Sequence, residues 1–169
     1  GVMPWTERIV GGAGADLRVN CVIPSFTNPN NLSIVTGASP AVHGICGNYF
    51  YDRVSEREVM MTAPELLRAP TLFEAFQKNG LRIGIVTAKD KLRGLLGAGL
   101  AFGDTGSVCF SAEHADQATL EENGIDRVTE RLNRPLPSVY SADLSEFVFA
   151  AGVMLMETLA LDVLYLSTT

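Results

Sequence analysis

The sequence is poor in basic residues. Its 169 residues include 13 lysines and arginines against 19 aspartates and glutamates, which gives a formal net charge of −6. The one short basic cluster is KDKLR at positions 89–93. Nucleic-acid-binding surfaces are usually basic overall or carry a clustered basic stripe. The composition therefore argues against a nucleic-acid partner.

Cysteine and histidine are also scarce. Cys21, Cys46 and Cys109 are far apart, odd in number and without a CxxC spacing, which indicates neither a disulfide framework nor a zinc knuckle. We expect all three to be buried thiols in a reducing compartment. His43 and His114 are the only histidines, and neither has a second His or Cys at a metal-ligand spacing. We expect both histidines in turns or at the surface.

Long apolar runs are missing as well. The longest candidate, 147–161, is interrupted by Glu157, and the sequence begins with no signal peptide. We therefore expect a cytoplasmic protein without a membrane partner. Hydrophobic residues make up 47% of the chain, which is ample for a packed core.

The two ends of the sequence predict a fragment of a larger protein. The chain begins with Gly1-Val2-Met3-Pro4 in what we interpret as the first turn of a helix, and the last apolar strand, at 161–166, is followed only by Ser167-Thr168-Thr169. Natural chains rarely stop at the rim of a buried strand. The exposed sheet edges of such a fragment would also allow it to self-associate.

Apolar strands alternate with helical patterns along the chain. Turn residues and hydrophobic spacing predict strands at 17–23, 49–51, 81–87, 107–110 and 161–166, and helices at 4–10, 71–79, 90–96, 112–122 and 141–159. A polar loop is expected between 51 and 62. Thr71 and Glu74 have the spacing of a capping box. This alternation predicts an α/β fold with a mostly parallel sheet and helices on both faces.

Polar residues follow three of the predicted strands. PSFTN comes after Ile23, TAKDK after Val86, and STT after Leu166. In an open parallel sheet, ligands bind beyond the carboxyl ends of the strands. We therefore expect one sheet edge to gather side chains from all three exits. These are Thr27, Lys89, Lys91 and Ser167-Thr168-Thr169.

Thr27 lies at the start of a predicted helix, with Asn28 as N-cap and Pro29 as the first helical residue. The helix N-terminus favours an anion, so the hydroxyl could bind phosphate or attack phosphorus. Helix polarity is too weak to ionise the hydroxyl, which would need a metal. The alternative is that Thr27 is one more capping hydroxyl.

Lys89 and Lys91 directly follow a buried strand. Two ammonium groups there could clamp a carboxylate or a phosphonate, and Asp90 between them need not neutralise both. The alternative is a solvated loop. The glycine-rich stretch at 94–106 resembles a phosphate cradle, but it lacks the Walker lysine, and we interpret it as a flexible loop.

The region PSFTNPNNLSIVTGASPAVHGICGNYFYD resembles the nucleophile region of the alkaline phosphatase superfamily, in the branch of nucleotide pyrophosphatase/phosphodiesterases. That motif is similar to P-T-x-T-x-P-N, then S/T-x-V-T-G and P-x-x-H-G-I-x-x-N. The matching positions are Pro24, Thr27, Asn30, Val35, Thr36, Gly37, Pro40, His43, Gly44, Ile45 and Asn48. FTNPNN and VTAKDKLRGLLG resemble the phosphonoacetate hydrolase family more than the phosphodiesterases, and the likeness runs along the whole chain.

The resemblance implies an alkaline phosphatase-like core with two zinc ions that hydrolyses the C–P bond of phosphonoacetate to acetate and phosphate. It implies Thr27 as the nucleophile and as a zinc ligand, and Asn48 as a hydrogen-bond donor to a phosphonate oxygen. It implies that Lys89 and Lys91 hold the carboxylate of this small-molecule phosphonate. Residues 1–169 would be part of that catalytic core.

The sequence departs from the family in its metal ligands. The family's first metal-binding Asp would lie upstream of Gly1, and its D-x-x-x-H and D-H ligands would follow Thr169. With only Thr27 left, we expect this chain alone to bind zinc poorly and to be inactive. Two other functions stay open. One is a nucleotide pyrophosphatase or phosphodiesterase, in which Phe50 and Tyr51 would hold a base, and the other is a non-catalytic anion-binding module.

Overall fold

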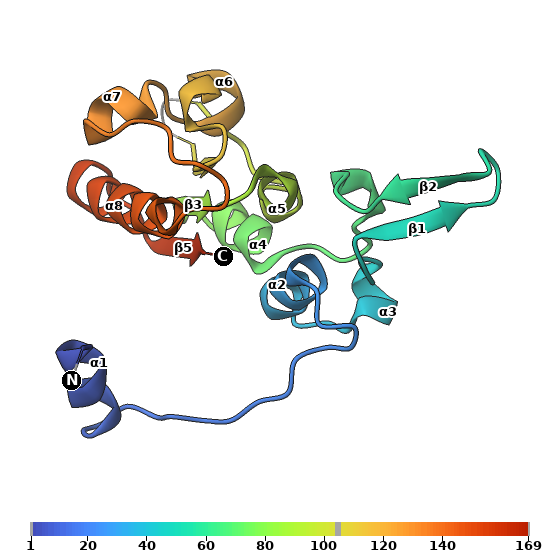
Figure 1. Cartoon of the computed structure of the whole chain (residues 1–169), viewed down its shortest axis with the longest axis horizontal. Helices are drawn as coiled ribbons and strands as arrows, with labels where there is room; N and C mark the ends of the chain where they lie inside the picture. The colour runs from blue at the N-terminus through green and yellow to red at the C-terminus, as the bar shows by residue number, and fades with distance from the viewer. Residues whose placement is uncertain (1, 104–105, 169) are drawn as a thin grey trace.

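The computed structural model describes residues 2–103 and 106–168 (Figure 1). Its centre is a parallel three-stranded sheet in the order β4 (Val108–Ser111), β3 (Ile83–Thr87), β5 (Val163–Ser167). Ile85 of β3 pairs with Cys109 on one side and with Tyr165 on the other. All five residues of β3 are buried, as expected for a parallel strand covered on both faces.

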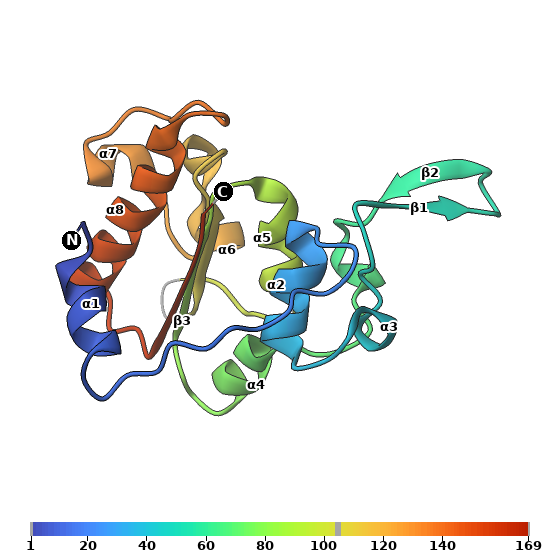
Figure 2. The same ribbon diagram turned by 60° about the horizontal axis from the view of Figure 1, so that its bottom comes forward.

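Helices cover both faces of this sheet, as Figure 2 shows with the sheet seen close to its edge. On one face lies α8 (Ala142–Thr158), which contacts β3 and β5. On the other face lie α4 (Leu72–Lys78) and α5 (Asp90–Leu96), with α2 (Thr27–Thr36) packed on them. The predicted α/β fold, with a parallel sheet and helices on both faces, is confirmed.

Each face of the sheet has its own hydrophobic core. The core under α8 includes Val86, Phe110, Leu144, Phe147 and Leu155. The core on the opposite face is built from α2, α4 and α5, and it includes Leu32, Phe73, Ile85, Leu92 and Leu95. Because β3 contributes to both cores, its carboxyl end is held rigidly, and the loop that follows it starts from a fixed point.

Local signals predicted several helix ends correctly. The Oγ1 of Thr71 accepts a hydrogen bond from the Glu74 amide (3.1 Å), so Thr71 caps α4 as the sequence indicates. The predicted helices at 4–10 and 90–96 appear as α1 (Pro4–Val10) and α5. Ser141 holds the N-cap position of α8, but its hydroxyl donates to the Ser138 carbonyl and accepts no capping bond.

The predicted strand at 17–23 is wrong. In the described part of the chain this segment is extended but pairs with no other strand, and Leu17, Val19 and Ile23 are mostly exposed. A strand needs a partner for its backbone hydrogen bonds, and alternating apolar residues alone do not supply one. The segment links α1, which has no buried residue, to α2 (Figure 1).

Two further elements differ from the prediction. The expected polar loop after 51 contains β2 (Arg57–Met60), which pairs antiparallel with β1 (Tyr49–Asp52) in a hairpin that projects from the body (Figure 1). The single helix predicted at 112–122 is broken, because Ala118 is extended and Thr119 caps a new helix. The pieces are η2 (Ala115–Gln117) and α6 (Leu120–Asn123). The remaining short helices are α3 (Pro40–His43), η1 (Pro64–Leu66) and α7 (Val128–Leu132).

The scarce residues also differ in part from expectation. Cys109 is buried as predicted, but Cys21 and Cys46 are exposed. His43 is completely buried at the end of α3, so the prediction of a surface residue is wrong for it, whereas His114 is exposed. In residues 2–103 and 106–168, no helix has the length and hydropathy needed to cross a bilayer.

Candidate functional site

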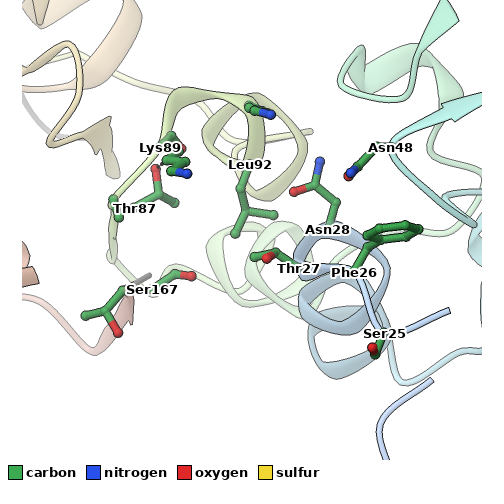
Figure 3. A pocket seen from close by; sticks show the side chains of 12 residues that line it. Ser25, Phe26, Thr27, Asn28, Asn48, Thr87, Lys89, Leu92 and Ser167 are labelled. Atoms are coloured by element: carbon green, nitrogen blue, oxygen red, sulfur yellow. Dashed lines mark hydrogen bonds between the residues drawn. The ribbon is translucent and has the colours of Figure 1, made fainter. Parts of the chain in front are cut away.

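A cavity of about 420 Å³ lies at the carboxyl edge of the sheet. Thr27, Asn48, Lys89 and Lys91 all line it, although the sequence spreads them over more than sixty positions. Figure 3 shows side chains that line it from the start of α2, from the residue before β1 (Asn48), from the exit of β3 with the following helix α5 (Leu92), and from the exit of β5. The expected Ser167 and Thr168 are also in the lining, and Thr169 lies outside the described residues.

Thr27 is the first residue of α2, and its side chain is exposed to the cavity. The helix therefore begins one residue before the predicted N-cap, and Phe26 takes the N-cap position with an extended backbone. Asn28 is buried inside the first turn, so its predicted capping role is wrong. The hydroxyl of Thr27 thus lies where the N-terminal end of the helix dipole favours negative charge.

Asn30 fixes the chain just before Thr27. Its Oδ1 accepts a hydrogen bond from the Val22 amide (3.0 Å), and its Nδ2 donates to the Phe26 carbonyl (2.9 Å). The Asn30 side chain thereby connects the extended segment before α2 to the N-cap residue. These two hydrogen bonds fix the path of the backbone that leads into Thr27.

Asn31 joins the same helix to the sheet. Its Nδ2 donates to the Thr27 carbonyl (3.0 Å), and its Oδ1 accepts from the Tyr165 hydroxyl (2.6 Å). The Tyr165 ring packs edge-on against Phe73, with 5.4 Å between ring centres. Burial raises the pKa of Tyr165, so the phenol stays protonated and remains a donor at neutral pH.

The exits of β3 and β5 are tied to each other. The Ala88 amide donates to the Ser167 carbonyl (2.8 Å), which extends the pairing of the two strands into the cavity wall. The Thr87 hydroxyl donates to the Lys89 carbonyl (2.9 Å) and holds the turn that carries the two lysines. The loop after β3 is therefore ordered by backbone partners.

Asp90 is neutralised by groups other than the lysines beside it. Its Oδ1 accepts from Arg93 Nε (2.6 Å) and from the Ser111 hydroxyl (2.9 Å). Burial opposes ionisation, but these bonds outweigh it and lower the pKa of Asp90. Among the described residues, neither Lys89 nor Lys91 forms an ion pair. The Asp90 carboxylate therefore does not pair with the lysines on either side of it.

Asn48 lies just before β1 and lines the cavity on the side away from the exits of β3 and β5 (Figure 3). Its carbonyl accepts from the Met61 amide (2.8 Å), which fixes its backbone at the base of the hairpin. Phe50 and Tyr51, the aromatic pair suggested for a base, do not line the cavity. The aromatic side chain in the lining is Phe26.

His43 stabilises the loop that leads to Asn48. Its Nδ1 accepts from the Ile45 amide (3.2 Å), so the neutral ring carries its proton on Nε2, which lies 3.0 Å from Ser33 Oγ. Burial is the main cause that lowers the pKa of His43. The motif histidine therefore supports the fold next to the site and is not part of the cavity wall.

The donor set of the cavity does not fit zinc. Its lining offers hydroxyls, amides and ammonium groups, and it includes no carboxylate, imidazole or thiolate. No group of three or more His, Cys, Asp or Glu that could hold a metal occurs anywhere in the described ranges. Thr27 is therefore the only predicted metal ligand that this chain brings to the cavity.

The model of the type I phosphodiesterase/nucleotide pyrophosphatase family matches residues 6–123. The chain belongs to this family. A curated relative, an uncharacterized pyrophosphatase/phosphodiesterase of Schizosaccharomyces pombe, is 36% identical over a match that covers 41% of this chain and 15% of that protein.

Two solved structures are much more similar. Phosphonoacetate hydrolase from Sinorhizobium meliloti 1021 in complex with phosphonoformate is 58% identical, with a TM-score of 0.94, and the match covers 100% of this chain and 41% of that one. The complex with phosphonoacetate gives 60% identity and a TM-score of 0.84 over 88% of this chain and 36% of that one. The predicted resemblance is confirmed, and this chain spans about two fifths of those enzymes.

Three residues at the site were not expected from the sequence. Asn31 and Tyr165 form the link between α2 and β5, and Tyr140 places its ring 4.8 Å from Lys89 Nζ. Asn31, the third Asn of NPNN, offered a weak signal, because it is a polar residue in the middle of an otherwise partly apolar helix. No local pattern marks Tyr140 or Tyr165, whose partners are distant in the sequence.

Proposed function

We propose that this chain supplies the nucleophile and the carboxylate-binding residues of a phosphonoacetate hydrolase, which cleaves the C–P bond to give acetate and phosphate. One observation carries the proposal: Thr27, Asn48, Lys89 and Lys91 share a single cavity. The identity of 58–60% to solved phosphonoacetate hydrolases supports the choice of substrate.

The two lysines suit a small dianionic acid. Lys89 and Lys91 would bind the carboxylate as point charges, and the Asn48 amide would donate to a phosphonate oxygen. The Thr27 hydroxyl would lose its proton to solvent water and its oxygen would form a bond to phosphorus as the C–P bond breaks, and the electron pair of the broken bond would pass to carbon. An ammonium beside the carboxylate stabilises that charge as an enolate, and a proton from water completes acetate. Water would then release phosphate from the threonine.

Zinc is proposed only for the longer protein. Zinc would supply a lower pKa for the threonine hydroxyl and neutralise the phosphonate, but this chain's donors do not fit it. The part proposed for this chain's own residues is therefore to supply the Thr27 nucleophile and to bind and orient the substrate. We propose that residues 1–169 are one section of a catalytic core in a cytoplasmic enzyme.

The test compares two substrates with full-length protein supplied with zinc. Phosphate release from phosphonoacetate should exceed cleavage of a nitrophenyl phosphodiester. Lys89→Ala and Lys91→Ala should impair use of phosphonoacetate more than use of the diester. Lys78→Ala is the matched control, because Lys78 pairs with Glu74 on an exposed helix face. Equal losses on both substrates would contradict the carboxylate role.

Other outcomes would identify the alternatives. Preferred cleavage of the diester would indicate a phosphodiesterase. The matched family and the Schizosaccharomyces pombe relative are both described as pyrophosphatase/phosphodiesterases, which is the reason to test this activity. Binding of phosphonoacetate without turnover, even with zinc, would indicate a non-catalytic anion-binding module. In a separate zinc titration of the 169-residue chain, tight uptake of two ions would contradict the expectation that it binds zinc poorly.

A further inference from the structure

We infer that Asn31 is a positioning residue for Thr27, held in place by Tyr165. This inference rests on the proposed function, because it assigns a role to Asn31 in the reaction of Thr27. We call the Thr27–Asn31–Tyr165 hydrogen-bond series the Asn31 bridge. Its two bonds measure 3.0 Å and 2.6 Å, and they connect the first turn of α2 to the middle of β5.

Hydrogen-bond chemistry fixes the orientation of the Asn31 amide. The Thr27 carbonyl can only accept, so the nitrogen of the amide must face it. The amide oxygen must then face Tyr165 and Ser167, whose hydroxyls lie at 2.6 Å and 3.5 Å. Both ends of one short side chain are therefore in use, and the amide cannot turn without losing bonds on both sides.

The sheet end of the bridge is rigid. Tyr165 is a residue of β5 in register with Ile85 of the buried central strand. Its ring packs at an interplanar angle of 67° against Phe73, which is 1% exposed. The hydroxyl of Tyr165 is thus held in a fixed position. By bonding to it, Asn31 fixes the position of the start of α2 relative to the sheet.

The bridge connects two walls of the cavity. Thr27 lines the cavity on the α2 side, and Ser167 lines it on the β5 side. Elsewhere α2 packs mainly on α3, α4 and α5. Of the hydrogen bonds within residues 2–103 and 106–168, those that join α2 to β5 both end on Asn31. Asn31 therefore helps to set how far Thr27 lies from the opposite wall.

The lysines do not depend on this bridge. Lys89 and Lys91 follow β3, and their turn is held by the Thr87 and Ala88 hydrogen bonds. Loss of the bridge should therefore leave binding of the substrate carboxylate nearly unchanged while the nucleophile is misplaced. Small displacements of a reacting group can cost up to about 100-fold in rate.

The experiment measures kcat and KM for phosphonoacetate with full-length Tyr165→Phe, Asn31→Ala and the double variant. Tyr165→Phe keeps the ring against Phe73 and removes only the hydroxyl. We expect kcat to fall roughly 5-fold to 10-fold in Tyr165→Phe and roughly 10-fold to 100-fold in Asn31→Ala, with KM within about 2-fold. The double variant should be no slower than Asn31→Ala, because both changes break the same bridge. Tyr51→Phe, at an exposed hairpin position outside the cavity, is the control.

The outcomes separate the inference from the proposed function. A wild-type protein that releases no phosphate from phosphonoacetate would overturn the proposed function, and the inference with it. An active wild type with unchanged kcat in Tyr165→Phe, or with a rise in KM alone, would overturn only the role of Asn31. If Asn31→Ala does not fold, as judged by thermal unfolding, Tyr165→Phe decides the question by itself.

Discussion

The ammonium nitrogen of Lys89 lies 4.8 Å from the centre of the Tyr140 ring. An aromatic face therefore restrains one of the two cations at the cavity, from a loop that precedes α8. Tyr140 is highly exposed, and a cation–π contact at an exposed site contributes about 0.5–1 kcal/mol. The contact is weak, but it acts on the group proposed to bind the substrate carboxylate.

We expect Tyr140→Leu to raise KM for phosphonoacetate about 2-fold to 5-fold, because Lys89 loses the ring that restrains it. Steady-state kinetics of the full-length protein provide the measurement. Tyr140→Phe keeps the ring face and should behave as wild type. Equal effects of the two substitutions would show that the hydroxyl, and not the ring, matters.

Asp90→Asn should lower the free energy of unfolding by about 1 kcal/mol at neutral pH, because Arg93 and Ser111 lose a charged acceptor. The pKa of Asp90 is lowered in the folded state, so its contribution is present above the usual aspartate pKa and is lost as pH falls through the folded value. Urea unfolding at pH 7 and at acid pH measures this. The difference between wild type and variant should shrink below about pH 4. A constant difference would contradict the ionic role.

His43 should make the fold sensitive to mild acid. Its pKa is lowered by burial, so the unfolded chain takes up a proton at a higher pH than the folded chain does. Stability is therefore full above the usual histidine pKa of about 6.5 and declines as pH falls toward the folded value. Urea unfolding between pH 8 and pH 5 should show this decline in wild type and a smaller one in His43→Gln. Identical slopes would contradict the role of His43.

The three cysteines should react in two classes. Cys21 and Cys46 are exposed, whereas burial raises the pKa of the Cys109 thiol to about 12. A disulfide reagent that releases a coloured thiolate should react with Cys21 and Cys46 in the native protein. It should react with Cys109 only after denaturant is added. Cys46→Ser and Cys21→Ser should each remove one of the fast groups. Rapid reaction of Cys109 in the native protein would contradict its burial.

Secondary-structure elements and caps were predicted correctly from the sequence where a local pattern determines them. The Thr71 cap and the fully apolar β3 depend on neighbours within a few residues or on burial of both strand faces. The placement of Lys89 and Lys91 at the cavity followed from the rule that ligands bind beyond the carboxyl ends of parallel strands. Thr27 also lines the cavity, but it reaches it as the first residue of α2, and the strand predicted before it does not form in the described residues.

Other features depend on partners that the sequence does not reveal. The segment at 17–23 has strand-forming residues but no strand to pair with in the described ranges. The bond between Asn31 and Tyr165 joins residues 134 positions apart, and no spacing rule predicts it. His43 lies in a polar, glycine-containing stretch that is typical of a surface turn. In the structure it is buried and hydrogen-bonded to Ile45 and Ser33, and no local pattern predicts this.

The walls of the cavity have an implication for how the protein is made. Ser167 and Asn31 are 136 residues apart, so a ribosome that adds about 5–20 residues per second would deliver them roughly 7 to 30 s apart. During that interval the start of α2 has no β5 to anchor it. Contacts between distant residues form late in folding, so the cavity between α2 and β5 should form only after β5 has docked.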